Sequence, residues 1–140
     1  MKQALALLMA IGAAFFALNG TIGYEKTYAI AYGMITVMAV VISGTFFWLW
    51  RRRATPLALG MSFSWAGAAS VLGWWWLYQV LHQPAFMVKH AGLFTFLAIY
   101  SAGAVMHVIV MHRSMGLNVW LVILPGALGF AGVLAVARAM

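Results

Sequence analysis

The chain has 140 residues, of which 66% are apolar and 6% are charged, and its mean hydropathy is +1.02. A soluble globular domain carries about 25% charged residues, so this composition excludes a soluble fold. It also excludes intrinsic disorder, which requires low hydrophobicity. An integral membrane protein remains.

The charge of the chain is unbalanced, with eight basic residues against one acidic residue, Glu25, for a formal net charge of +7. The basic residues are few and stand at the ends of apolar stretches. This placement indicates that the basic residues set the orientation of the protein in the membrane and contact anionic lipid. It does not favour nucleic acid as a partner. The chain has no cysteine, which excludes disulfides and thiol catalysis.

Five apolar stretches have the length of a membrane-spanning helix, which takes about 20 residues. The opening Met1-Lys2 and the apolar run 4–18 resemble a signal peptide, but Asn19-Gly20 makes a poor cleavage site. We therefore expect an uncleaved first transmembrane helix. The five predicted helices cover, in approximate numbers, residues 3–22, 29–50, 56–80, 86–111 and 118–138.

The boundaries between these stretches carry polar and helix-breaking residues. The triple arginine 51–53 cannot enter hydrocarbon and ends the second stretch. Thr55-Pro56 is a typical helix start for the third stretch. Because the loops are short, adjacent helices should be antiparallel neighbours. The sequence thus predicts an all-α integral membrane protein, a compact bundle of five transmembrane helices that forms a single transmembrane domain over residues 1–140.

The distribution of Lys and Arg predicts the orientation of the bundle. A cytoplasmic N-terminus places five basic residues inside (Lys2, Arg51, Arg52, Arg53 and Arg113) and three outside (Lys26, Lys89 and Arg138). We therefore expect the N-terminus in the cytoplasm and the C-terminus outside. The expected location is a bacterial inner (plasma) membrane.

Small residues at helical spacing predict where helices approach each other closely, as they do in membranes. The third stretch has Gly60, Ser64 and Gly67 on one face. Glycines eleven residues apart return nearly to the same face and are expected to line single seams. Such glycines occur in the second stretch (Gly33, Gly44) and the fourth (Gly92, Gly103); the fifth has a closer group (Gly126, Gly129, Gly132).

A group of His and Met residues in the fourth stretch is the strongest candidate for chemistry. His107 and Met111 are four residues apart and share a helix face, and His112 follows directly. Imidazole and thioether are ligands for haem iron or copper. The pair Gly103 and His107 resembles, over a handful of residues, the pigment-ligating segment of bacterial antenna helices. That resemblance implies a haem or (bacterio)chlorophyll-type tetrapyrrole on His107, with space beside Gly103. The alternative is that these side chains only fill the bundle.

Two further histidines, His82 and His90, stand on either side of Pro84 in a short loop. They are candidates for a shared metal ion, although a complete site needs a third or fourth ligand. The alternative is a pair of solvated loop histidines.

Acid–base catalysis has little support, since Glu25 is the single carboxylic side chain and no second one completes a dyad. We do not expect an enzyme. The first hypothesis for function is a non-catalytic accessory or assembly subunit of a larger respiratory or photosynthetic membrane complex, in contact with lipid and other subunits, with a tetrapyrrole or quinone at the fourth helix. The alternative is a small permease or channel for a solute or metal ion. It would self-associate around a polar path formed by Thr36, Ser43, Ser64, Ser101 and His107.

Overall fold

The computed structural model describes residues 2–116, 118 and 120–139. These residues form six helices and no strand: α1 (Lys2–Ile22), α2 (Tyr24–Arg53), α3 (Pro56–Val80), α4 (Ala85–Val88), α5 (Gly92–Met115) and α6 (Trp120–Ala139). Four segments are long and apolar enough to cross a membrane: Lys2–Ile22, Tyr24–Arg53, Pro56–Val80 and Ala85–Ser114. The predicted all-helical class is confirmed, and four of the five predicted spans have helices that could cross a membrane.

The bend between α1 and α2 occurs at one residue, Gly23, whose φ of 85° is in the region that glycine adopts without strain. Helix α2 therefore begins at Tyr24 rather than at residue 29. Tyr24, Tyr28 and Tyr32 stack along its first turns, with ring centroids 6.0 and 4.3 Å apart. This contact between side chains four residues apart extends the helix into the segment that we predicted to be a loop.

The fourth predicted helix is divided into α4 and α5. The Met87 side chain of α4 is buried, and its carbonyl accepts a hydrogen bond of 3.1 Å from Trp74 Nε1 of α3. The His90 ring lies 5.4 Å from the Trp74 ring. Trp74 thus holds the short helix α4 over the end of α3, and the chain turns again before α5 begins at Gly92.

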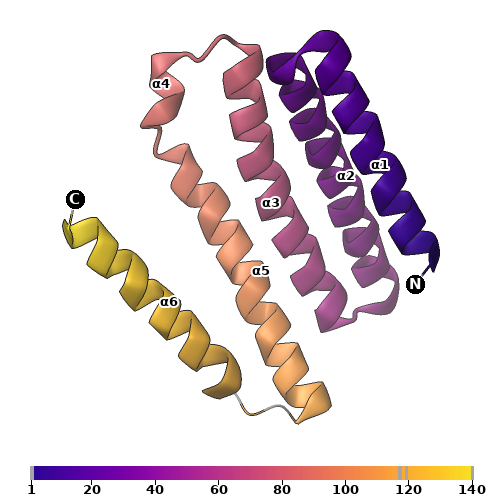
Figure 1. Cartoon of the computed structure of the whole chain (residues 1–140). Helices are drawn as coiled ribbons and strands as arrows, with labels where there is room; N and C mark the ends of the chain where they lie inside the picture. The colour runs from indigo at the N-terminus through magenta and orange to yellow at the C-terminus, as the bar shows by residue number, and fades with distance from the viewer. Residues whose placement is uncertain (1, 117, 119, 140) are drawn as a thin grey trace.

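Helix α3 is the centre of the arrangement (Figure 1). It packs along its length against α2 on one side and α5 on the other, whereas α1 contacts α2 only lightly. Helix α6 runs beyond α5, on the opposite side of the molecule from α1. The close packing that we predicted for the whole bundle is therefore observed for α2, α3 and α5.

The contact between α3 and α5 is a contact between backbones. A Cβ atom at Gly67 would lie 2.5 Å from the Tyr100 backbone, and one at Gly103 would overlap the Ser64 backbone. A Cβ at Gly60 would lie 3.2 Å from Met106 Cβ. Only glycine fits at 67 and 103, so the predicted seam of small residues on α3 is confirmed.

The contact between α2 and α3 combines small residues with a pair of serines. Ser43 Oγ donates to the Ser62 carbonyl at 2.9 Å, and Ser62 Oγ donates to the Ser43 carbonyl at 3.1 Å. Gly33 faces the Trp76 indole, to which a Cβ would come within 2.9 Å. Interhelical hydrogen bonds of this kind contribute about 0.6 kcal/mol each in membrane proteins.

The predicted seams of glycines eleven residues apart are wrong. Gly44 faces open space, because a Cβ atom added there would have no neighbouring atom within 4 Å. The same holds for the three glycines of α6, which are Gly126, Gly129 and Gly132. Gly92 faces the His90 ring and not a neighbouring helix. The spacing shows that two glycines share a face of one helix, but it does not show whether another helix packs on that face.

We expect Gly67→Leu to lower the thermal stability of the purified protein, because the larger side chain forces α3 and α5 apart. Overpacking of this kind typically costs about 1–3 kcal/mol. Gly44→Leu is the matched control, since its Cβ enters open space. The measurement is thermal unfolding of both variants in one detergent. Equal melting temperatures for Gly67→Leu and the unsubstituted protein would contradict the described packing.

Candidate functional site

The predicted ligand group of α5 is only partly available to a cofactor. His107 is half-buried and Met111 is 40% exposed. Gly103, however, is buried against the Ser64 backbone of α3. The space that we predicted for a flat macrocycle beside Gly103 is filled by α3, so Gly103 serves helix packing. Ligand binding by His107 stays a prediction, and it requires a group on another side of the imidazole.

His112 lies in the last turn of α5 beside Arg113, and its side chain is exposed. Its carbonyl accepts a hydrogen bond of 3.1 Å from the N–H of Gly116, which ends the helix in a left-handed conformation. His112 thus marks a helix end. Its role as an additional metal ligand beside His107 and Met111 stays a prediction.

His82 and His90 have different surroundings. His90 stacks on Trp74, and its Nδ1 accepts a hydrogen bond of 3.0 Å from the N–H of Gly92. His82 instead lines a cleft between α2 and α3. Within the described part of the chain, no group of three or more His, Cys, Asp or Glu side chains is close enough to hold a metal ion.

The three consecutive tryptophans of α3, Trp74, Trp75 and Trp76, have separate neighbours. Trp74 contacts α4 and the Phe96 ring of α5, at a centroid distance of 5.8 Å, and Trp76 covers Gly33 of α2. Trp75 packs edge-on against Tyr78 of its own helix. Trp74 and Trp76 therefore hold helices together, and the three rings have separate partners.

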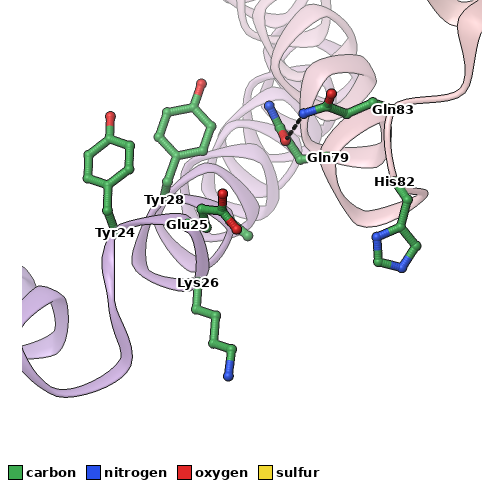
Figure 2. Close-up of a pocket in the computed structure, with 8 residues that line it drawn as sticks. Tyr24, Glu25, Lys26, Tyr28, Gln79, His82 and Gln83 are labelled. Carbon is green, nitrogen blue, oxygen red and sulfur yellow. Dashed lines mark hydrogen bonds between the residues drawn. The ribbon is translucent and has the colours of Figure 1, made fainter.

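A polar cleft is present that the sequence did not single out. It lies between the start of α2 and the end of α3 and has a volume of about 690 Å³. Figure 2 shows its lining side chains: Tyr24, Glu25, Lys26 and Tyr28 from α2, and Gln79, His82 and Gln83 from α3 and the turn after it. The available signal was that the predicted antiparallel helices bring residues near 25 and near 80 to the same membrane face.

The turn that closes this cleft has an uncommon backbone. His82 and Gln83 have φ values of 59° and 60°, a backbone conformation that residues other than glycine rarely adopt. The N–H of Gln83 donates to the Tyr78 carbonyl at 2.8 Å, and Gln83 Nε2 donates to Gln79 Oε1 at 3.3 Å. These bonds stabilise the turn, and the side chains of His82 and Gln83 line the cleft.

A second, apolar cavity adjoins the first. It is a groove of about 550 Å³ along α2, and Ala29 lines both cavities. The groove is lined, beyond Ala29, by Ile30, Gly33, Met34, Val37, Met38 and Trp76. Its surface is suited to hydrocarbon, whereas the cleft above it is suited to polar groups.

Comparison with protein-family models, curated proteins and solved structures finds no match for this chain. Its function is therefore argued from its own residues.

Proposed function

We propose that the protein is a non-catalytic accessory or assembly subunit of a larger membrane complex. The observation that carries the proposal is the exposure of its two outer helices. In α1 no residue is buried, and every side chain described in α6 is exposed. Apolar helices that pack on little of their own chain offer long faces to lipid and to the helices of other subunits.

Three of the five polar residues proposed for a permease path, Thr36, Ser43 and Ser64, are engaged in contacts within or between helices. Thr36 Oγ1 donates to the Tyr32 carbonyl of its own helix at 2.7 Å, and Ser43 bonds to Ser62. Ser64 packs against Gly103. These contacts favour a subunit over a channel, because a polar path requires such groups to face a common water-filled space.

The proposal includes a fifth span, α6, and an orientation. Helix α6 has 20 residues, which correspond to about 30 Å of helix and hence to the hydrocarbon core. The positive-inside rule places the N-terminus and the triple arginine in the cytoplasm and the C-terminus outside, in a bacterial inner membrane.

This orientation is tested with reporter fusions. A reporter placed after Arg53 should be active in the cytoplasm, and a reporter after Met140 should be active outside, because α6 completes an odd number of spans. Fusions after Val80 and after Met115 supply the intermediate positions. A cytoplasmic reporter at residue 140 would contradict the fifth span or the orientation.

The subunit role is tested by purification in a mild detergent from cells that express a tagged chain at its natural level. The particle should contain stoichiometric foreign membrane subunits and exceed the 15.3 kDa of the chain after subtraction of detergent mass. A particle built only from copies of this chain would overturn the proposal and favour the permease.

The same preparation tests the tetrapyrrole. If His107 holds one, the particle absorbs visible light, and His107→Ala abolishes that absorbance while membrane insertion persists. His112→Ala is the control and should retain the spectrum. A coloured particle whose spectrum survives His107→Ala would remove His107 from the cofactor role.

A further inference from the structure

The polar cleft and the apolar groove form one amphipathic site. They meet at Ala29, near the start of α2. The polar side chains lie at the helix ends, and the apolar side chains follow over the next turns, down to Met38. From Ile30 to Met38 the groove extends about 12 Å along the helix axis. This order of surfaces matches the order of groups in a phospholipid.

The polar half carries the single carboxylate of the sequence, Glu25. The side chain of its neighbour Lys26 extends away from it, as Figure 2 shows, so the lysine ammonium does not pair with the Glu25 carboxylate. The rings of Tyr24 and Tyr28 stand on the same turn, with centroids 6.0 Å apart. A carboxylate beside aromatic rings attracts a cation through charge-assisted hydrogen bonds and the ring faces.

The rim of the cleft provides hydrogen-bond donors. The amides of Gln79 and Gln83 and the imidazole of His82 line it from the α3 side. Such groups donate to the oxygens of a phosphate. The cleft thus presents an acceptor for a cation on α2 and donors for a phosphate on α3, a pairing that fits a zwitterion.

The apolar half is shallow and open to the bilayer. Ile30, Met34 and Val37 are 42%, 51% and 58% exposed. The floor is formed where Trp76 lies on Gly33, because any side chain at position 33 would displace the indole. The absence of a side chain on this glycine lets the Trp76 indole lie against α2, and the groove that a hydrocarbon chain can follow is lined by this indole and by the side chains of α2.

We propose that this site binds a zwitterionic phospholipid whose headgroup ends in a primary ammonium, of the phosphatidylethanolamine type. The ammonium donates to the Glu25 carboxylate, the phosphate accepts from the donors of the α3 turn, and one acyl chain lies in the groove. A primary ammonium is favoured because it has N–H donors, which a choline headgroup lacks. An anionic lipid without an amine cannot pair with Glu25, and its negative charge is repelled by the Glu25 carboxylate.

The test is a lipid titration of the delipidated full-length protein in detergent, followed by native mass spectrometry. The probes are dioleoyl-phosphatidylethanolamine, -phosphatidylcholine and -phosphatidylglycerol. The first should half-saturate the protein at a concentration several-fold lower than the others. Glu25→Gln should raise that concentration by about fivefold or more, since it removes a charge-assisted bond. Lys89→Gln is the control, because it changes the charge of an exposed residue that lines neither cavity, and it should bind like the unsubstituted protein.

The groove is tested separately. Val37→Trp fills the apolar half and should weaken binding of phosphatidylethanolamine, whereas Ile35→Trp, on the same helix and outside the groove, should not. Equal binding of the three lipids by the unsubstituted protein would overturn the proposal. So would unchanged binding of phosphatidylethanolamine in both Glu25→Gln and Val37→Trp. Neither result depends on whether the chain is a subunit of a larger complex.

Discussion

The close approach of α3 and α5 is the constraint on which the rest of the structure depends. Lipid tails are as apolar as leucine, so helices in a membrane gain little by burying apolar side chains against each other. Here the backbones meet at Gly67 and Gly103, where no side chain separates them. Dispersion contacts between backbones then accumulate along the interface. With α5 fixed in this way, the opposite face of α3 is left for α2 and the serine pair.

This arrangement explains why the outer surface is so apolar. The buried hydrophobic residues are small or few: Ala39, Ala58, Ala69 and Met87. Large apolar side chains point outward instead, as on α1, where Phe16 is 82% exposed. A membrane protein can be built in this way because the bilayer, and not the interior, receives these side chains. The proposed lipid site and the proposed subunit contacts both use that outward surface.

The helical class and the α3 seam could be predicted from the sequence, since they depend on composition and on local spacing. Thr55-Pro56 identified the start of α3 for the same reason, because the preference for proline in the first turn of a helix is local. The partners of each small residue could not be predicted. Gly67 and Gly44 are both glycines in similar apolar stretches of the sequence. Gly67 contacts a backbone, whereas Gly44 faces open space.

The candidate sites show the same limit. Gly103 beside His107 has the spacing of a cofactor pocket, but α3 occupies that space, which only the tertiary arrangement could reveal. The cleft around Glu25 was missed because three of its eight lining residues come from the end of α3 and the turn after it. It also depends on α2 beginning at Tyr24, and the stacked tyrosines that extend the helix so far were assigned to a loop.

Cysteine cross-linking tests the packing of α3 on α5 most directly, because the chain has no native cysteine. A Cβ at Gly60 lies 3.2 Å from Met106 Cβ, close to the roughly 3.5–4.5 Å of a disulfide. Oxidation of the double variant Gly60→Cys, Met106→Cys in membranes should therefore give an intramolecular disulfide. The pair Gly60→Cys, Val105→Cys should not cross-link, since Val105 is 58% exposed. Equal cross-linking of both pairs, or of the second pair alone, would contradict the account.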